Sequence, residues 1–352
     1  MTINETHMKY FLIMSLSFLS LFGCKGYSNL NPDAFEAMLN GDKTAQLVDV
    51  RTPDEYAEGH LPGAVNIDWY ADDFLEKAQS LLELSHPVMV YCRSGKRSAE
   101  AASKLGKAGF EVSNLQGGYL AWTEAGKPVS TYEVERFRTV TGEPVAITLI
   151  KHACLEIRYK GLSIQVDPVS GLGKPTDYAA EFPKADIILV THEHGDHCDK
   201  TAVDALQKDG TTLVTNARSK DILGWGTVMA NGDELDLQEG MHLQAVPAYN
   251  NTPGHLQFHP KGRDNGFVLT LDGLRIYIAG DTEDIPEMTA LKDIDIAFLP
   301  VNQPYTMTVE QCIHAAKTIA PKVLIPYHFS QTDISSLPES LPGIEVRLRQ
   351  MQ

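Results

Sequence analysis

A short histidine-rich segment constrains the fold of this chain more than any other feature of its sequence. The apolar stretch 185–190 leads directly into Thr191-His192-Glu193-His194-Gly195-Asp196-His197. Three imidazoles and a carboxylate so close together are costly to bury without a partner, and a metal ion supplies one. The first two imidazoles lie two positions apart, while Asp196 and His197 are adjacent, so a turning loop can aim one pair at each of two metal ions. We therefore predict a metal centre here in preference to a polar surface loop.

Strands that end in a possible metal ligand recur further along the chain. The strand expected at 275–280 leads to Asp281, and the one at 323–326 leads to Tyr327-His328. A helix is expected at 309–320. Other strands are expected at 145–150, 155–159, 162–167 and 267–271. The hairpin signal Asp272-Gly273 joins the last of these to a strand at 274–278, within the segment that leads to Asp281. This pattern predicts two sheets packed face to face with helices outside.

This part of the chain resembles the metallo-β-lactamase superfamily, from Val145 to beyond His328. Its segments 149–153, 166–168 and 325–328 look most like the ascorbate-6-phosphate lactonase-like metal-dependent hydrolases. The resemblance implies an αββα sandwich that binds two divalent metal ions and a small-molecule substrate. It also implies that a hydroxide between the metals is the nucleophile, with the pKa of the water lowered from about 15.7 towards about 7.

The resemblance further assigns the ligands. The first metal would be bound by His192 and His194 and the second by Asp196, His197 and His328, with Asp281 between them. The first metal needs one more imidazole, for which His255 and His259 are both candidates; we prefer His259 because 258–262 matches that branch.

Two further roles stay open at the sequence level. Asp196 is the catalytic candidate, because it can position the hydroxide or move its proton. His152 is expected either to line the substrate pocket or to support the ligands structurally. Nitrogen and oxygen ligands suit zinc, manganese or iron, and zinc is the metal we expect.

A second candidate site begins at Cys92. The apolar strand 88–91 leads into Cys92-Arg93-Ser94-Gly95-Lys96-Arg97-Ser98, and a helix is expected at 98–108. The start of a helix presents N–H groups and a positive dipole end to one point, and the three basic residues add charge. These features favour the thiolate, so we predict that Cys92 is nucleophilic.

Motifs around this cysteine closely resemble a single rhodanese domain. They are Leu47-Val48-Asp49-Val50-Arg51, the segment 59–67, the Cys92 loop and the segment 115–122. The resemblance implies a parallel sheet with helices on both faces, and a Cys92 persulfide that takes sulfane sulfur from a donor and passes it to a thiol acceptor or cyanide. Arg93, Ser94, Gly95, Lys96, Arg97 and Ser98 would cradle it.

Two observations refine this second prediction. The loop from Cys92 to Arg97 has the length that the rhodanese family uses for sulfur, whereas related phosphatases use a longer loop. Asp49, Arg51 and His60 are family landmarks for which we expect structural roles. The alternative is a rhodanese module that only binds or senses sulfur.

The N-terminal segment has the pattern of a bacterial lipoprotein signal. Lys9 precedes the apolar run 11–23, which is too short to cross a bilayer and ends at Cys24. We predict a signal peptide over 1–24 and a lipid on Cys24, which would hold the protein on a membrane of the cell envelope. A buried N-terminal helix with an incidental cysteine is the alternative. The domains expected are 25–128 (rhodanese), 129–143 (linker) and 144–352 (hydrolase).

Composition excludes some functions. Lys and Arg number 30 against 46 Asp and Glu, a formal charge of −16 that disfavours nucleic acid as a partner. Five cysteines do not make a disulfide scaffold. The sequence therefore predicts an envelope-anchored sulfurtransferase and dinuclear metal hydrolase. The alternatives are an iron-dependent persulfide dioxygenase and a non-catalytic sulfur or redox sensor.

Overall fold

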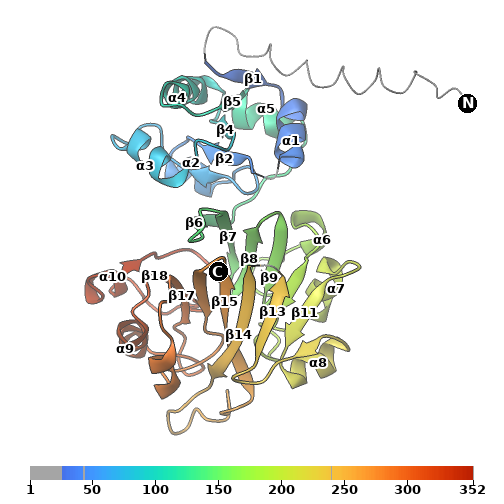
Figure 1. Cartoon of the computed structure of the whole chain (residues 1–352), viewed down its shortest axis with the longest axis vertical. Helices are drawn as coiled ribbons and strands as arrows, with labels where there is room; N and C mark the ends of the chain where they lie inside the picture. The colour runs from blue at the N-terminus through green and yellow to red at the C-terminus, as the bar shows by residue number, and fades with distance from the viewer. Residues whose placement is uncertain (1–25, 43, 239, 352) are drawn as a thin grey trace, which may run out of the picture. The chain divides into compact units, whose positions relative to one another are not determined.

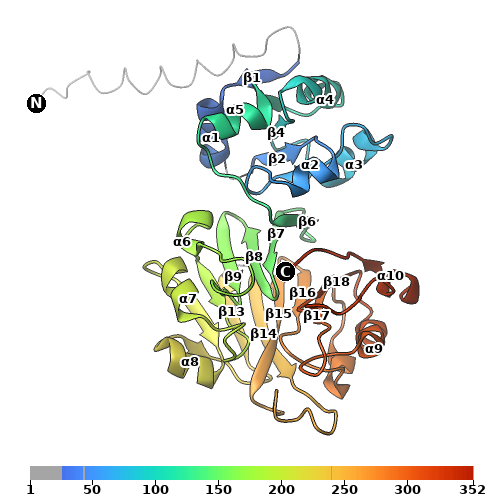
Figure 2. The same ribbon diagram turned by 180° about the vertical axis from the view of Figure 1, so that it is seen from behind.

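The computed structural model describes residues 26–42, 44–238 and 240–351. The predicted signal peptide, 1–24, and its Cys24 lie outside these residues. The chain forms two compact units, one up to Thr131 and one from Tyr132 onward; Figures 1 and 2 show the elements of each from opposite sides. Within the described ranges, no helix combines the length and apolar character needed to cross a membrane.

A parallel five-stranded sheet forms the centre of the N-terminal unit. Its order is β1-β5-β4-β2-β3, and every neighbouring pair is parallel. The strands are β1 (Ser28–Leu30), β2 (Gln46–Asp49), β3 (Val65–Asn66), β4 (Val88–Tyr91) and β5 (Val112–Leu115). The helices are α1 (Pro32–Gly41), α2 (Pro53–Ala57), α3 (Phe74–Leu81), α4 (Lys96–Lys107) and α5 (Gly118–Glu124).

Helices cover both faces of this sheet, as the sequence predicts. Alternate residues of a strand point to opposite faces. Phe35 of α1 and Trp122 of α5 pack with one set of strand residues. Phe74 of α3 and Leu105 of α4 pack with the other set. The predicted fold class of this unit is confirmed.

Two seven-stranded sheets form the centre of the C-terminal unit. Their orders are β12-β11-β10-β9-β8-β7-β6 and β13-β14-β15-β16-β17-β18-β19. The first contains β6 (Glu133–Arg138), β7 (Pro144–Lys151), β8 (Cys154–Tyr159), β9 (Leu162–Val166), β10 (Ile187–Leu189), β11 (Thr212–Thr215) and β12 (Thr227–Val228). The second contains β13 (Glu234–Gln238), β14 (Met241–Ala248), β15 (Asp264–Leu271), β16 (Leu274–Ile278), β17 (Ile296–Pro300), β18 (Val323–Tyr327) and β19 (Glu345–Val346).

The main core lies between these two sheets, and helices cover their outer faces. Ile157 of β8 and Phe267 of β15 belong to the shared core. The first sheet is covered by α6 (Tyr178–Glu181), α7 (Lys200–Leu206) and α8 (Ala217–Leu223). The second is covered by the 3-10 helix η1 (Pro286–Ala290), α9 (Val309–Ile319) and α10 (Leu337–Ser340). This is the predicted αββα sandwich.

The predicted linker is wrong over part of its length. Residues 129–143 contain β6, which pairs antiparallel with β7 from Glu133↔Leu149 to Arg138↔Pro144. The charged residues of β6 suggest a solvent-exposed linker, but in the fold their partners come from a distant part of the chain. Glu135 is buried against the guanidinium groups of Arg347 and Arg349, and Phe137 packs on the core.

The ends of the strands bring the candidate ligands together. β9 and β10 are parallel neighbours, as are β16, β17 and β18, so the carboxyl ends within each set lie at one edge. β10 leads to His192, β16 to Asp281 and β18 to His328. The candidate metal ligands are therefore expected to meet at the edge of the sandwich where these strands end.

Candidate functional site

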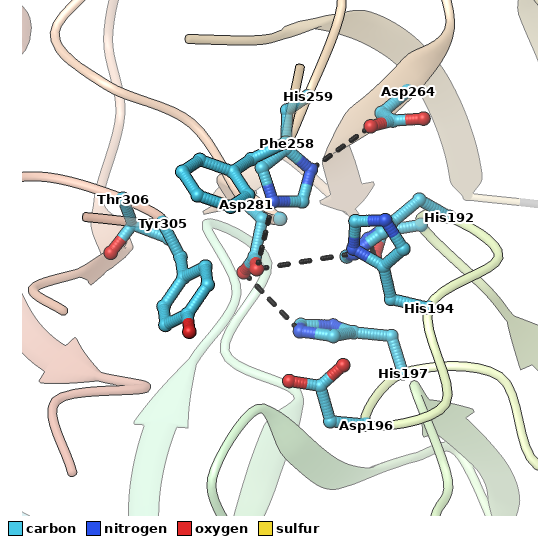
Figure 3. Close-up of polar contacts among 12 residues, drawn as sticks. His192, His194, Asp196, His197, Phe258, His259, Asp264, Asp281, Tyr305 and Thr306 are labelled. Atoms are coloured by element: carbon cyan, nitrogen blue, oxygen red, sulfur yellow. Dashed lines mark hydrogen bonds and ion pairs between the residues drawn. The ribbon is translucent and has the colours of Figure 1, made fainter. Parts of the chain in front are cut away.

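Three imidazoles from two segments form the first group of candidate ligands. His192 and His194 follow β10, and His259 lies between β14 and β15; one ring nitrogen from each lies within 4.8 Å of the others. His192 Nε2 is 3.2 Å from His194 Nδ1. The centroid of the His259 ring is 4.9 Å from that of His192 and 4.7 Å from that of His194. Figure 3 shows the three rings around one side of Asp281.

A second group combines His152, Asp196, His197 and His328. Asp196 Oδ2 is 3.2 Å from His152 Nε2 and 3.6 Å from His328 Nε2. His197 and His328 are buried, whereas the Asp196 side chain is 37% exposed. His152, whose role the sequence leaves open, therefore lies against Asp196 and within this group.

Asp281 joins the two groups. Its carboxylate is 3.2 Å from His197 Nε2 and 3.3 Å from His328 Nε2, both in the second group. The same carboxylate is 3.4 Å from His259 Nε2 and 3.9 Å from His192 Nε2, both in the first group. The structure thus brings all seven predicted metal ligands into one cluster.

Two more carboxylates each contact the Nδ1 atom of a candidate ligand histidine. Asp167 Oδ2 is 2.8 Å from His197 Nδ1, and Asp264 Oδ2 is 3.0 Å from His259 Nδ1. Arg263 donates two hydrogen bonds of 2.7 Å to Asp264. In both cases Nδ1 contacts the carboxylate and Nε2 points toward Asp281, an orientation typical of metal-binding histidines.

The Cys92 loop places two donors on the sulfur. Cys92 is buried at the end of β4. The Gly95 N–H donates to Sγ over 3.2 Å, and the Ser98 hydroxyl donates over 3.4 Å. Gly95 has a φ of 87°, a left-handed conformation that glycine adopts without steric cost. Of the predicted cradle, Gly95 and Ser98 therefore contact the sulfur directly.

The basic residues of the loop do not all face the sulfur. Arg97 donates two hydrogen bonds of 2.7 Å to the Glu55 carboxylate, so its guanidinium is held by α2. Arg93, Ser94 and Lys96 are exposed. These three side chains are on the solvent side, where an incoming anion would meet them.

The start of α5 holds the Cys92 loop from the other side. The Tyr119 N–H donates to the Cys92 carbonyl over 2.8 Å, and the Leu120 N–H donates to the Arg93 carbonyl over 3.0 Å. A Cβ on Gly118 would lie 2.2 Å from the Cys92 carbonyl oxygen, which no other residue could tolerate. Sequence reasoning gave Gly118 no role, although the Gly117-Gly118 pair is a visible signal of such a close approach.

The three family landmarks of this domain lie in its scaffold. The Arg51 guanidinium donates to Asp49 and to the Gly59 carbonyl. The ring of His60 stacks on Tyr56 with centroids 3.7 Å apart. This geometry supports the structural roles expected for Asp49, Arg51 and His60.

Family models match both units. The model of the beta-lactamase superfamily domain matches residues 146–328, more than half of the chain. The chain belongs to the β-lactamase superfamily. The model of the rhodanese-like domain matches residues 31–125. The protein is thus a metal-dependent hydrolase of this superfamily with a rhodanese-like domain.

Known relatives match the superfamily domain closely. A UPF0173 metal-dependent hydrolase from Geobacillus sp. (strain WCH70) is 30% identical over 194 residues, which are 52% of this chain and 85% of the relative. One from Ligilactobacillus salivarius is 34% identical over 191 residues, 52% of this chain and 84% of the relative. The crystal structure of a candidate metal-dependent hydrolase from Parabacteroides distasonis is 54% identical, with a TM-score of 0.61; the match covers 63% of this chain and all of that one.

Burial and charge set opposite protonation states within the superfamily domain's cluster. Burial, together with the neighbouring imidazoles, lowers the pKa of His192 well below its ordinary value. Burial also disfavours charge on His197, but Asp281 and Asp167 outweigh it and raise its pKa well above the ordinary value. At His328, Asp281 and Asp196 likewise outweigh burial and raise the pKa to about 9. Because a metal ion binds the unprotonated imidazole, cations at this cluster would compete with protons for His197 and His328.

Unsatisfied polar atoms show that the cluster suits metal ions. His197 Nε2, Asp281 Oδ1 and His328 Nε2 are buried without a hydrogen bond of acceptable geometry. Buried polar atoms almost always have a hydrogen-bond partner, so three such atoms without one in the same cluster indicate that a ligand binds there. Imidazole nitrogens and carboxylate oxygens are donors that zinc, manganese and iron accept. The residues present therefore fit divalent cations.

The structure distinguishes the two alternative histidines. His255 Nδ1 is 3.1 Å from Glu283 Oε1 and lies in none of the candidate ligand groups among the described residues. His259 lies in the first group, as preferred from the sequence. Sequence reasoning did not single out Asp264; its position five residues after His259, at the start of a strand, was the available signal.

Proposed function

We propose that the superfamily domain is a dinuclear hydrolase. Phosphate esters, phosphodiesters, thioesters and lactones all suit such a centre, and we take carboxylic esters as the class to test, including the lactones that the resemblance to the ascorbate-6-phosphate lactonase branch implies. The observation that carries this proposal is the central place of Asp281, which contacts imidazoles of both ligand groups. His192, His194 and His259 would hold one cation, and Asp196, His197 and His328 the other. Two cations there, with zinc favoured, would lower the pKa of a bound water and polarise the scissile bond.

The chain's own residues support this chemistry. Asp196 is the exposed carboxylate of the cluster and contacts both His152 and His328. Burial would raise its pKa, but hydrogen bonds with those imidazoles outweigh burial and lower it. Asp196 is therefore ionised, which suits it to hold a cation and to orient a bound water through its carboxylate oxygens. His152, beside it, is placed to orient Asp196 or to contact the substrate.

Metal analysis tests the proposal. The purified full chain, loaded with zinc or manganese, should hold two ions per chain and hydrolyse simple esters or lactones. In His194→Ala the first site should lose its ion, and hydrolysis should fall by several orders of magnitude. His314→Ala is the matched control, because that histidine is 73% exposed and its ring pairs with Asp284, away from the candidate ligands.

The alternatives give different results in the same experiment. A single iron per chain with oxygen consumption would support the persulfide dioxygenase instead. Full metal content and full activity in His194→Ala would refute the assigned ligands.

We further propose that the rhodanese-like domain transfers sulfur through Cys92. The thiolate would attack the outer sulfur of thiosulfate, the S–S bond would break, and sulfite would leave with the bonding electron pair. A thiol or cyanide would then take the sulfur from the persulfide and return the thiolate. The Gly95 N–H and the Ser98 hydroxyl, which both point at Sγ, support the proposal because they stabilise an anionic sulfur. A sensor would form the persulfide without turnover.

We also propose that a lipid on Cys24 anchors the protein to a membrane of the bacterial cell envelope, facing the periplasm or the surface. The proposal is supported by the apolar run 11–23 that precedes this cysteine. Radiolabelled palmitate should label the full-length protein in bacteria and should not label Cys24→Ser. Equal labelling of both would refute the anchor.

A further inference from the structure

Two aromatic rings stand beside the metal cluster and are not buried in the core. Phe258 directly precedes the candidate ligand His259, and Tyr305 lies in the loop after β17. Their ring centroids are 4.9 Å apart, with an angle of 69° between the ring planes. Tyr305 is 46% exposed, and Phe258 is partly exposed. Figure 3 shows both rings on the side of Asp281 away from His194.

One buried asparagine fixes the two segments that carry these rings. The backbone N–H of Asn250 donates to the His259 carbonyl over 2.9 Å. Its side-chain amide donates to the Tyr305 carbonyl over 2.8 Å. Asn250 is 2% exposed, so both bonds are shielded from water. The two rings are therefore held at a defined separation by the chain itself.

The same segments are attached to the candidate ligands. Arg263 donates to the Phe258 carbonyl over 2.7 Å and also to Asp264, the carboxylate that contacts His259. On the Tyr305 segment, the side-chain nitrogen of Asn302 lies 3.5 Å from His328 Nδ1, and the Asn302 N–H donates to Thr306 Oγ1 over 2.7 Å. The position of each ring is thus coupled to that of one ligand.

The surroundings of Phe258 and Tyr305 favour a flat, uncharged part of a ligand. The Tyr305 hydroxyl has no hydrogen-bond partner among the residues that the structure describes, and nearly half of the residue is exposed. The nearby cations are already neutralised, because Arg263 pairs with Asp264 and Lys261 pairs with Glu287. An open aromatic surface beside a polar centre is typical of ligand sites.

We propose that Phe258 and Tyr305 form an aromatic wall that selects ester substrates carrying a planar aromatic group next to the scissile bond. This inference rests on the proposed hydrolase function, since it names the substrate class of that site. The group would pack against the two rings while the ester lies over Asp281, and the Tyr305 hydroxyl would remain available as a hydrogen-bond donor.

Binding of a pair of ring acids tests the aromatic wall without relying on turnover. Phenylacetate and cyclohexylacetate have similar sizes and the same charge, and only the first is planar and aromatic. The zinc-loaded full chain should bind phenylacetate about tenfold more tightly in calorimetry, which is the scale of one or two aromatic contacts. The methyl esters of the two acids should show the same preference in kcat/KM.

Variants assign the preference to the wall. Phe258→Leu and Tyr305→Leu keep an apolar side chain and should each reduce the preference several-fold at unchanged zinc content. Tyr305→Phe should retain it, because the ring remains. Val140→Ala, at another exposed apolar side chain of the same domain, should leave it unchanged.

The outcomes separate this inference from the proposed function. Ester hydrolysis without any aromatic preference, or with a preference that both leucine variants keep, would overturn the aromatic wall and leave the hydrolase standing. A phenylacetate preference that both leucine variants lose, in a chain that hydrolyses no ester, would support the wall and refute the hydrolase proposal.

Discussion

His197 contacts a different aspartate through each of its ring nitrogens. Asp167 faces Nδ1 at 2.8 Å, and Asp281 faces Nε2 at 3.2 Å. A proton directed toward Asp167 fixes the tautomer and leaves the Nε2 lone pair for a metal ion. Asp167 also accepts from the N–H and the hydroxyl of Thr191, so the same carboxylate orders the start of the histidine-rich loop. One residue type thus serves as a candidate ligand at 281 and as a positioning group at 167.

The positioning role of Asp167 predicts a loss of metal affinity. In Asp167→Asn the negative charge behind His197 is removed, so zinc affinity measured by chelator competition should fall about 10- to 100-fold. Asp236→Asn is the matched control, because Asp236 contacts His242 at 2.8 Å on the surface. Equal affinities in the two variants would show that Asp167 has no effect on the metal.

Much of the site could be predicted at this scale, because His192, His194, Asp196 and His197 lie close together in the sequence. Between His255 and His259, the family motif at 258–262 favours His259 correctly, but the physical reason is visible only in the structure, because it depends on which carboxylate each ring contacts. Glu283, which meets His255, also accepts from the N–H groups of Asn251 and Thr252. That carboxylate organises a loop, whereas Asp264 orients a ring. Only the folded chain separates these two partners.

At the scale of elements, α2 and α4 are joined by the pair of Glu55 and Arg97. Hydrogen bonds from Arg97 are the main reason that the pKa of Glu55 is lowered from 4.5 to about 2. Glu55 also completes a capping box with Thr52 at the start of α2. The pair therefore fixes the helix that begins with the Cys92 loop.

The lowered pKa of Glu55 predicts a pH-dependent stability. Because the folded-state pKa lies below the ordinary value, the pair stabilises the domain fully above about pH 4.5, and this contribution is lost as the pH falls toward 2. The difference in free energy of unfolding between the parent chain and Glu55→Gln should therefore shrink over that range. Glutamine can still accept from the Thr52 N–H in the capping box, but it cannot accept both hydrogen bonds from Arg97, so the ion pair is removed while the cap is kept.

Tryptophan fluorescence can follow this effect. A Trp225→Phe background leaves only Trp69 and Trp122, both in the rhodanese-like domain, as reporters. Glu100→Gln, at an exposed position on α4, controls for the general loss of a negative charge. A difference that stays constant from neutral pH to pH 2 would contradict the assignment.

The elements that the sequence predicts correctly are those with local signals. The Asp272-Gly273 hairpin pairs Leu271 with Leu274 as expected. β6 escaped prediction because its partners Arg347 and Arg349 lie at the other end of the chain. From its charges alone, such a segment is predicted to be a solvated linker. The strand becomes predictable only when Arg347 and Arg349 are known to lie beside it.

At the scale of the whole molecule, each unit contains a complete candidate site. The residues that contact Cys92 Sγ belong to the N-terminal unit, and every member of the metal cluster belongs to the C-terminal unit. Each unit also has hydrophobic clusters of its own. Loss of one chemistry should therefore leave the other.

Cys92→Ser tests this independence. The variant should lose thiosulfate:cyanide sulfur transfer completely, because serine cannot form a persulfide. Its zinc content and ester hydrolysis should equal those of the parent chain. A parallel Cys312→Ser variant, at a buried cysteine within α9, separates the loss of a nucleophile from the loss of any thiol. Surviving transfer in Cys92→Ser would show that another group accepts the sulfur.

The adjacency of Phe258 and His259 limits how this enzyme could diversify. Inserting or deleting residues in that loop would move a ligand together with the selecting ring, so recognition could not be retuned by changing loop length without disturbing the catalytic centre. New selectivity would have to come from exchanging the side chain at 258 or 305 on an unchanged backbone. Homologues that accept other substrates should accordingly keep the spacing and differ in the residue.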